Sequence, residues 1–317
     1  MLILVTGGNG FLGSSVVDGL AASGHEVVSA DLTVSAPRAE QQCVTSVVMD
    51  VTDAELVDRV IGEHRPDCVV HLASVVTPGK DSSRGLEYAV DVDGSRHVFE
   101  ACLRHDVRRV VVSSSGAAYG YHRDNPARLT EDDPVRGNRE FAYSHHKRRV
   151  EEMLAELRDT EPGLEQVVLR IGTILGERVD NQITALFERK RLLKIRGADS
   201  PFVFIWDTDV VAIIEQAVTG SVTGVFNVAG DGALTIDEIA RLLHKSTLAV
   251  PEPLLRGALA VGSRLGLTAY GPEQTKFLQF RPVLANDRLK EVFGFAPTHT
   301  SRQAFEAWCA SAGARRG

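Results

Sequence analysis

The chain has 317 residues, of which 44% are hydrophobic and 24% charged, and its formal net charge is −7. This balance suits a globular protein whose core needs neither disulfides nor a structural metal. Acidic and basic residues are interspersed, which excludes the concentrated positive surface that a nucleic-acid partner requires. No apolar run approaches the ~18 residues of a membrane span, and the four cysteines form no CxxC pair. We therefore expect a cytoplasmic protein without a bound metal.

Short β-branched runs alternate with helical patterns through the first two-thirds of the chain. Continuous apolar runs of this length predict strands covered on both faces, at 2–6, 26–30, 44–49, 68–72, 108–113 and 167–171. Amphipathic patterns between them predict helices over 11–23, 54–64, 86–105 and 140–158. This alternation is typical of an α/β protein with a doubly wound parallel sheet.

The alternation breaks after residue 172. Further patterns predict helices over 182–194, 209–219 and 236–244, strands over 202–205 and 225–228, and then a mostly helical tail. We expect residues 1–172 to form the sheet domain, with 202–230 returning to that sheet. Residues 173–201 and 231–317 should form a smaller, mostly helical lobe that binds the substrate.

The strongest local pattern is TGGNGFLG over 6–13, which follows the first strand and opens the first helix. Gly7 permits a tight turn, Gly10 lets the backbone approach a pyrophosphate, and Gly13 lets the helix pack closely on the strand. The helix start at Phe11 and Leu12 then offers free N–H groups and a partial positive charge to phosphates. The pattern predicts a Rossmann-type dinucleotide site.

Asp31 ends the second predicted strand, where open α/β sheets bind their ligands. A carboxylate at this position accepts hydrogen bonds from the adenosine ribose hydroxyls and repels a 2′-phosphate. The next residues are Leu32 and Thr33 and not an arginine. We therefore expect NAD to be the cofactor, in preference to NADP.

Tyr143 and Lys147 are four residues apart on a predicted helix, so their side chains share one face. A phenol with an ordinary pKa of about 10 is a poor base at neutral pH, and a neighbouring ammonium should lower that pKa. We expect Tyr143 to exchange a proton with a substrate hydroxyl while hydride moves between that carbon and nicotinamide. Lys147 would also hold the nicotinamide ribose. His145 and His146, between the pair, should face solvent or a partner helix.

Together with later landmarks, these motifs resemble the extended short-chain dehydrogenases, the NAD-dependent epimerase/dehydratase superfamily. The later landmarks are HLAS (71–74), SSSGAAYG (113–120), YSHHK (143–147), FVFIWDTDVV (202–211) and VFNVAGDGALTIDEIARLL (225–243). The resemblance implies that Ser115 hydrogen-bonds the reacting oxygen. It also implies cofactor contacts outside the glycine turn at Asp50, Val51, Leu72, Ala73, Ser74 and Ser113.

The sequence departs from this family at several positions. Nucleotide-sugar 4,6-dehydratases need an Asp–Glu pair where this chain has Gly116 and Ala117, which excludes that mechanism. Thr173 replaces an asparagine that binds the diphosphate in many nucleotide-sugar enzymes. Asp91 replaces the usual asparagine, and its carboxylate is either structural or part of an altered proton relay. Tyr119 either lines the substrate pocket or is a buried aromatic at a strand exit.

These patterns leave three functions open. The first is an epimerase or dehydrogenase acting at a secondary alcohol or ketone of a sugar or nucleotide-sugar-like substrate. The second is a ketone reductase with an apolar substrate, because HLASVVTPG (71–79) resembles the 3β-hydroxysteroid dehydrogenases and 254–267 is rich in Leu, Ala and Val. The third is a non-enzymatic NAD-binding regulator, although a regulator has no need for Ser115, Tyr143 and Lys147.

The two long predicted helices, 86–105 and 140–158, suggest an assembly. In proteins that the chain resembles, the equivalent helices pair across a two-fold axis, which implies a homodimer. Four apolar residues could supply the paired faces or could simply cover the sheet: Phe99, Leu103, Met153 and Leu157.

Overall fold

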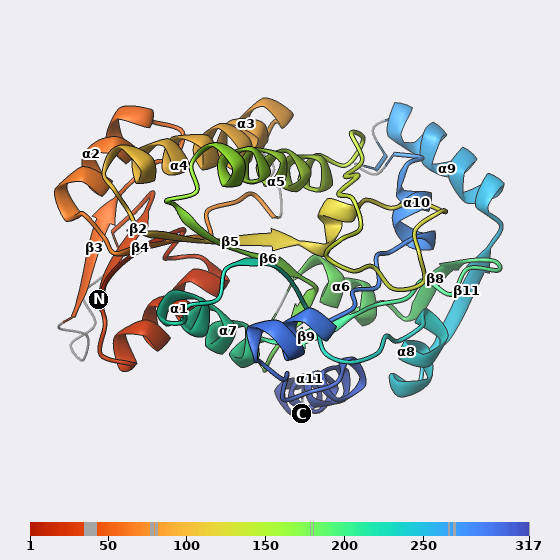
Figure 1. Cartoon of the computed structure of the whole chain (residues 1–317). Coiled ribbons are helices and arrows are strands. Elements are labelled where there is room, and N and C mark those ends of the chain that lie inside the picture. The colour runs from red at the N-terminus through yellow and green to blue at the C-terminus, as the bar shows by residue number, and fades with distance from the viewer. Residues whose placement is uncertain are drawn as a thin grey trace.

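The computed structural model describes residues 1–34, 43–76, 79, 82–177, 179, 181–265, 267–268 and 271–316. A seven-stranded sheet with the order β10-β6-β5-β4-β1-β2-β3 runs through it (Figure 1). All of its neighbouring strands pair in parallel, as the sequence predicts. The strands are β1 (Leu2–Thr6), β2 (Glu26–Asp31), β3 (Val44–Val48), β4 (Cys68–His71), β5 (Arg109–Ser115), β6 (Glu165–Ile171) and β10 (Gly224–Val228).

Helices cover both faces of this sheet (Figure 1). On one face, α1 (Phe11–Ala22) packs against α7 (Asp207–Thr219). The other face carries α2 (Ala54–His64), α4 (Gly94–Arg104) and α5 (Ala142–Thr160). Each face has its own apolar core, built from one side of the strands and the inner stripes of these helices. This double cover explains why the strands are continuous apolar runs.

The helix expected over 86–105 is three consecutive helical segments. It consists of α3 (Arg84–Tyr88), the π-helical turn η1 (Ala89–Asp93) and α4. Insertions of this kind in α-helices are frequent at functional sites. Gly94 follows the π turn, and a Cβ there would lie 2.7 Å from a methyl carbon of Val51. The helix therefore passes close to the segment that follows β3.

The four apolar residues of these helices cover the sheet. Phe99 is 1% exposed and belongs to the core of this face. Leu103, Met153 and Leu157 are partly buried and pack against the same core. Of the two roles that the sequence left open, these residues therefore cover the sheet. A partner subunit would contact other side chains of α4 and α5.

The helix expected over 182–194 is wrong in its second half. α6 (Gln182–Glu188) ends early, and β8 (Arg191–Ile195) pairs with β11 (Ser246–Val250) in a separate two-stranded sheet. Leu192 and Ile195 are buried while Arg191 is exposed. Such a short mixture of basic and apolar residues fits the periodicity of a helix as well as that of a strand. The pairing with a distant strand is what makes this segment a strand.

The return of 202–230 to the sheet is partial. β10 extends the seven-stranded sheet beside β6, and α7 covers its face. β9 (Phe204–Trp206) instead pairs with β7 (Thr173–Leu175) in a second two-stranded sheet, because β10 already occupies the edge beside β6. The division of the chain into a sheet domain and a substrate lobe stays a prediction.

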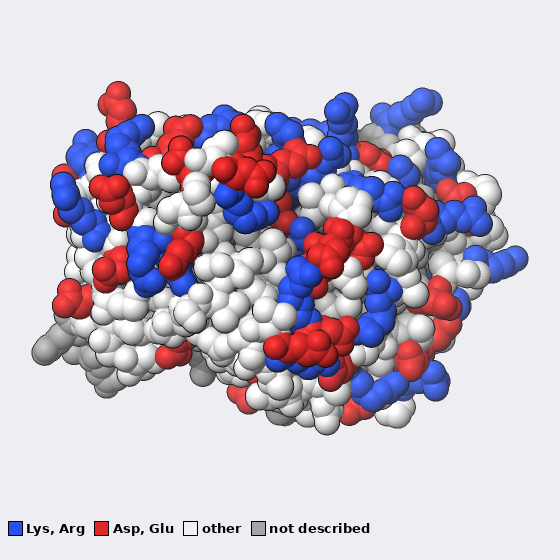
Figure 2. Space-filling model, viewed as in Figure 1, with Lys and Arg blue, Asp and Glu red and all other residues white. Residues whose placement is uncertain are grey.

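An aromatic core that includes Phe187, Phe204, Phe305 and Trp308 lies beside β9. Further segments complete the elements of the described residues. They are the 3₁₀ turn η2 (Gly116–Tyr119), α8 (Ile236–Leu242), α9 (Glu252–Arg264), α10 (Gln274–Gln279), the π turn η3 (Leu289–Phe293) and α11 (Ser301–Arg316). Within the described ranges, no helix is long and apolar enough to cross a membrane. In the view of Figure 2, basic and acidic side chains are interspersed along the top and the right of the molecule, while the lower left and centre carry few charges.

Candidate active site

The predicted site residues gather at the carboxyl edge of the seven-stranded sheet. The strands are parallel, so their carboxyl ends share one edge, where β1 ends at Thr6, β2 at Asp31, β4 at His71 and β5 at Ser115. The chain proceeds from β1 outward through β2 and β3 and then crosses to β4 on the other side. Ligands of open α/β sheets bind beside such a reversal. The topology alone therefore places a binding site above β1.

The glycine turn after β1 has the tight geometry that its sequence predicts. Gly7 has a φ of +68°, and a Cβ there would lie 2.9 Å from the amide nitrogen of Ala73. A Cβ on Gly13 would lie 2.0 Å from the carbonyl oxygen of Gly7, so a larger residue would push α1 off the turn. No side chain caps the start of α1 at Gly10. Its first N–H groups can therefore bind a phosphate.

Asp31 lies beside this turn. One carboxylate oxygen accepts a hydrogen bond from the backbone N–H of Asn9 at 2.9 Å, and the other accepts from that of Leu32 at 2.7 Å. A carboxylate has about four acceptor positions, so lone pairs remain for ribose hydroxyls. The side chain of Asn9 donates to the carbonyl of Thr33 at 2.6 Å, which ties the two loops together. Sequence reasoning did not single out Asn9, although it stands inside the glycine motif.

The segment after β4 forms the floor of the site. The hydroxyl of Thr6 accepts hydrogen bonds from the N–H groups of Leu72 and Ala73, both at 3.2 Å. Ser74 donates its hydroxyl to Asp91 at 2.9 Å. Hydrogen bonds thus connect the expected cofactor segment, Leu72–Ser74, to β1 on one side and to the π turn on the other.

Asp50 and Val51 follow β3 on the adenine side that the resemblance implies. Asp50 accepts hydrogen bonds from the N–H and the hydroxyl of Thr52, which closes a local turn. Val51 is 6% exposed and contacts Gly94. Their contact with a cofactor stays a prediction.

Ser115, Tyr143 and Lys147 come together as expected, although their roles stay a prediction. Lys147 is buried, and its Nζ lies 5.5 Å from the centre of the Tyr143 ring. The same Nζ donates to the carbonyl of Ser113 at 2.8 Å. A hydrogen bond joins Ser115 to Tyr143, and the Ser115 hydroxyl also accepts from the N–H of Ala117 at 3.1 Å.

The expected lowering of the Tyr143 pKa is wrong for this structure. Burial raises the pKa of the phenol well above its usual range, and the hydrogen bond with Ser115 only partly opposes it. Burial also lowers the pKa of Lys147, against the opposing charges of Asp91 and Glu151. The physical reason is that the ammonium of Lys147 donates to the carbonyl of Ser113, while the low-dielectric surroundings disfavour a phenolate.

Ser114 and Tyr119 point into the protein interior. Ser114 donates to Glu151 at 2.5 Å, and Glu151 accepts three charged hydrogen bonds from Arg170. Tyr119 is 0% exposed, and its hydroxyl contacts Arg170 at 2.7 Å and Asn227 at 2.9 Å. Burial raises the pKa of Tyr119 to about 12. The expectation that Tyr119 lines the substrate pocket is therefore corrected to its alternative, a buried aromatic that Arg170 needs as a partner.

Thr173 and the 3β-hydroxysteroid-like stretch add little to the site. Thr173 begins β7, is half-buried, and donates its N–H to the carbonyl of Val203 at 3.2 Å. A substrate contact through its hydroxyl stays a prediction. Thr77 and Pro78, within the stretch 71–79, lie outside the described residues.

For His146, the structure excludes the first of the two surroundings that the sequence left open, solvent or a partner helix. His146 does not face solvent, because it is 4% exposed and its Nδ1 lies 2.8 Å from a carboxylate oxygen of Asp91. The two residues are far apart in sequence, and the π turn at 89–93 brings Asp91 to the start of α5.

An aromatic and cationic cluster near Tyr143 went unnoticed in the sequence. The ring of Tyr121 contacts Phe141, two residues before Tyr143, and also Phe277 on α10. The guanidinium of Arg281 stacks on Phe277 at 4.4 Å and on Phe202 at 3.8 Å. Its Nε and one terminal nitrogen are buried without a hydrogen-bond partner among the described residues. Burial lowers the pKa of Arg281 to about 9. No local motif announces this cluster, because only tertiary packing assembles it.

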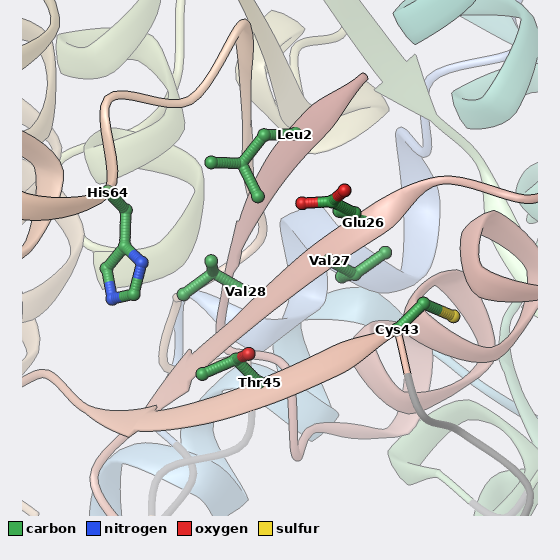
Figure 3. A pocket seen from close by; sticks show the side chains of 7 residues that line it. All are labelled: Leu2, Glu26, Val27, Val28, Cys43, Thr45 and His64. Carbon is green, nitrogen blue, oxygen red and sulfur yellow. The ribbon is translucent and has the colours of Figure 1, made fainter.

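A pocket at the other end of the sheet is a poor competitor. Figure 3 shows it near the amino ends of β1 and β2, with a volume of about 450 Å³. Its lining residues are Leu2, Glu26, Val27, Val28, Cys43, Thr45 and His64. Open α/β sheets bind ligands at the carboxyl ends of their strands, so we expect the ligand site at the opposite edge.

The chain is similar in sequence to known proteins. UDP-glucose 4-epimerase of Neisseria meningitidis is 32% identical over 185 residues, which are 55% of this chain and 53% of that protein. An uncharacterized protein of Mycobacterium tuberculosis is 23% identical over 309 residues, 96% of this chain and 82% of the relative.

Two solved structures show the same fold. UDP-glucose 4-epimerase of Thermotoga maritima with UDP-glucose has a TM-score of 0.75 and 21% identity, with both chains fully covered. The enzyme WbmG of Bordetella bronchiseptica, in complex with NAD and UDP, has a TM-score of 0.75 and 21% identity over 98% of this chain and 94% of WbmG.

The family model that describes an NAD dependent epimerase/dehydratase family matches residues 3–229. The glycine turn, the uncapped start of α1 and Asp31 fit a dinucleotide, which confirms the expected cofactor, NAD. The chain belongs to the NAD-dependent epimerase/dehydratase family.

Proposed function

We propose that this protein is an NAD-dependent epimerase or dehydrogenase that works at a secondary alcohol or ketone carbon of a sugar or nucleotide-sugar-like substrate. One observation carries the proposal: Ser115, Tyr143 and Lys147 converge at the carboxyl edge of the sheet, beside the glycine turn. A regulator that only binds NAD has no need for this convergence.

The protein's own groups divide the work of proton transfer. NAD, when bound, supplies the hydride acceptor and NADH the donor. Tyr143 exchanges the proton of the substrate oxygen, and Ser115 hydrogen-bonds that oxygen and orients it. Lys147 holds the nicotinamide ribose and contributes positive charge. The raised pKa of the phenol keeps it protonated at neutral pH, so Tyr143 is poised to donate a proton to a carbonyl oxygen.

Arg281 supports a substrate with an anionic or oxygen-rich part. Two nitrogens of the Arg281 guanidinium are buried without a hydrogen-bond partner among the described residues, which is costly, and a ligand that accepts their hydrogen bonds removes that cost. A diphosphate or a carboxylate has the right charge and geometry for a guanidinium. The rings of Phe202 and Phe277 then hold the guanidinium plane. A purely apolar substrate, the second function left open by the sequence, would leave Arg281 unpaired.

The test is turnover of a defined panel of substrates. The protein with NAD is mixed with UDP-hexoses, free sugars and secondary alcohols, and NADH formation is followed by absorbance and epimer formation by proton NMR. We expect exchange of epimers or NADH formation with at least one sugar substrate, and its loss in the Tyr143→Phe variant. Equal turnover by Tyr143→Phe, or activity confined to apolar alcohols, would overturn the proposal.

We also propose a homodimer through the outer faces of α4 and α5. These two helices contact each other on one face of the sheet (Figure 1). Their exposed positions carry charges of both signs, including Glu100, Arg104 and Glu156, which can complement one another across a two-fold axis. Light scattering at micromolar concentration should give twice the mass of the chain, and a monomeric mass would contradict the dimer.

A further inference from the structure

Asp91 occupies a buried position that a carboxylate can hold only with strong partners. It is 3% exposed and lies in the π turn η1. One oxygen accepts hydrogen bonds from the N–H of Val75 at 2.7 Å and the hydroxyl of Ser74 at 2.9 Å. The other lies 2.8 Å from Nδ1 of His146. The carboxylate thus joins the floor of the cofactor site to helix α5.

His146 stands between Tyr143 and Lys147 in sequence and is equally buried. Its ring packs edge-to-face on Tyr88 of α3, with ring centres 5.4 Å apart. The helix that carries the acid–base pair is therefore held at its first turn by a side chain of the π turn. The family usually has an asparagine at the position of Asp91, and an asparagine carries no charge that could interact with His146.

A second hydrogen-bonded chain fixes the π turn itself to the centre of the sheet. The hydroxyl of Ser95 donates to the carbonyl of Asp91 at 2.6 Å and contacts Nε2 of His71 at 2.9 Å. Nδ1 of His71 contacts the hydroxyl of Thr6 at 2.8 Å. Because β1 and β4 hold Thr6 and His71, Asp91 is placed by the rigid sheet and not by a loop.

We infer that Asp91 and His146 are positioning residues that link the cofactor-binding segment Leu72–Val75 to the helix carrying Tyr143 and Lys147. When the bound cofactor fixes the conformation of this segment, the Asp91–His146 pair also fixes the first turn of the helix that carries Tyr143 and Lys147. Ordering of that turn likewise fixes the segment. The role of this helix in proton transfer rests on the proposed function, whereas the link between the two segments does not.

The pair also contributes to the charge balance around Lys147. Asp91 and Glu151 support the positive charge of Lys147, and burial opposes it. His71, from β4, is kept neutral by burial, which lowers its pKa to about 3. His145, Tyr88 and Tyr143 are the other titratable neighbours of the pair. Removal of the Asp91 charge therefore acts on Lys147 as well as on His146.

The test compares Asp91→Asn and His146→Gln with a matched control. Asp209 is similarly buried, at 2% exposed, and accepts hydrogen bonds from one backbone N–H and one hydroxyl, both of Thr298. It lies on α7, on the opposite face of the sheet. Asp209→Asn therefore removes a comparably buried charge without touching the link. NADH affinity is measured by calorimetry, folding by thermal unfolding, and the His146 ring by ¹⁵N NMR.

We expect Asp91→Asn and His146→Gln each to weaken NADH binding about 10- to 100-fold, the range of a lost charged hydrogen bond. The double variant should lose no more than the larger single effect, because the two residues act as a unit. Asp209→Asn should lower the unfolding temperature and leave NADH affinity unchanged. In Asp91→Asn, the proton on His146 should move from Nδ1 to Nε2, because an amide donates where the carboxylate accepted.

Unchanged NADH affinity in folded Asp91→Asn and His146→Gln would overturn the inference. If either variant fails to fold, hydrogen exchange on the wild-type protein decides the same question. NADH should slow the exchange of the Val75 amide and of residues 143–147 together. Protection of Val75 without residues 143–147 would also overturn the link. None of these readouts needs a substrate, so a failure of the proposed reaction is a separate outcome.

Discussion

The ammonium of Lys147 lies 5.5 Å from the ring centre of Tyr143 and donates its hydrogen bond to the carbonyl of Ser113. The two groups are therefore neighbours whose charges are set by their surroundings more than by each other. Burial raises the pKa of Tyr143 and lowers that of Lys147. Both shifts favour the uncharged phenol and the uncharged amine, so the site resists forming a phenolate until a further positive charge or a hydrogen-bond donor arrives.

Tyr143→Phe should separate chemistry from binding. The phenol oxygen is not a cofactor anchor in this arrangement, so NADH affinity should remain nearly unchanged. Turnover should fall by roughly 10²–10⁴-fold, the usual cost of losing a general acid–base group. Tyr119→Phe is the matched control, because its hydroxyl supports buried Arg170 and Asn227. That control should lower thermal stability and spare turnover per folded molecule, and the opposite pattern would reverse the two assignments.

The pH dependence of the oxidative half-reaction should follow the ionisation of Tyr143. Oxidation of an alcohol needs the phenolate, whose fraction rises with pH, so the rate of NADH formation should rise with pH. Because the folded protein raises the pKa of Tyr143, the rise should continue beyond the ordinary phenol pKa of ~10. Stopped-flow rates from pH 6 to 11 test this. A plateau below pH 8 would show that bound cofactor and substrate reverse the effect of burial.

Asp31 should determine the choice between NAD and NADP. Its carboxylate accepts the N–H of Asn9 and keeps acceptor positions for ribose hydroxyls, whereas a 2′-phosphate would meet a negative charge at close range. We expect calorimetry to give tighter binding of NADH than of NADPH, and Asp31→Ala to reduce the difference. Asp67→Ala is the control, because its carboxylate accepts a hydrogen bond from the N–H of Leu2 at the opposite, amino end of the sheet. Equal affinity of the wild-type protein for both cofactors would refute this role.

Asp91 should make folding stability sensitive to acid. Burial alone would raise its pKa, but hydrogen bonds from His146, Val75 and Ser74 and the charge of Lys147 outweigh burial and lower it. A carboxyl with a lowered folded-state pKa stabilises the protein above its unfolded pKa of ~3.9, and this stability is lost as pH falls through the folded value. Asp91→Asn should therefore cost about 1–3 kcal/mol near neutral pH. Urea unfolding should therefore show the same difference at pH 7 and 5 and a smaller one at pH 3, and a difference that stays constant down to pH 3 would contradict it.

The sequence predicts the features that local patterns encode and misses those that depend on distant contacts. The glycine turn, Asp31 and the Tyr143–Lys147 spacing are each contained within a few residues, so both the cofactor and the central sheet could be predicted. β8 is a strand only because β11 pairs with it. The Asp91–His146 pair depends on a π turn that no sequence period reveals.

Arg281 should lower the free energy of unfolding of the protein in return for a role in substrate binding. Its guanidinium is stacked between Phe202 and Phe277, yet two of its nitrogens have no hydrogen-bond partner among the described residues. An unsatisfied buried polar group costs about 1–3 kcal/mol, so Arg281→Met should raise the unfolding free energy by a comparable amount. The same change should weaken the binding of an anionic substrate by at least tenfold, because a charged hydrogen bond to the substrate is lost. NADH affinity should remain unchanged, because Arg281 is expected to bind the substrate and not the cofactor.

The matched control for Arg281 is Arg288, a partly exposed arginine whose salt bridge to Asp132 has an N–O distance of 2.8 Å. Arg288→Met should change stability by less than about 1 kcal/mol, as is usual for exposed ion pairs, and should spare substrate binding. Urea unfolding and calorimetry with UDP and with a UDP-sugar measure both effects on each variant. If Arg281→Met binds these ligands like the wild type, the anionic part of the substrate lies elsewhere. If the variant is also destabilised, Arg281 is a structural stacking partner of the two rings and the apolar-substrate alternative regains its place.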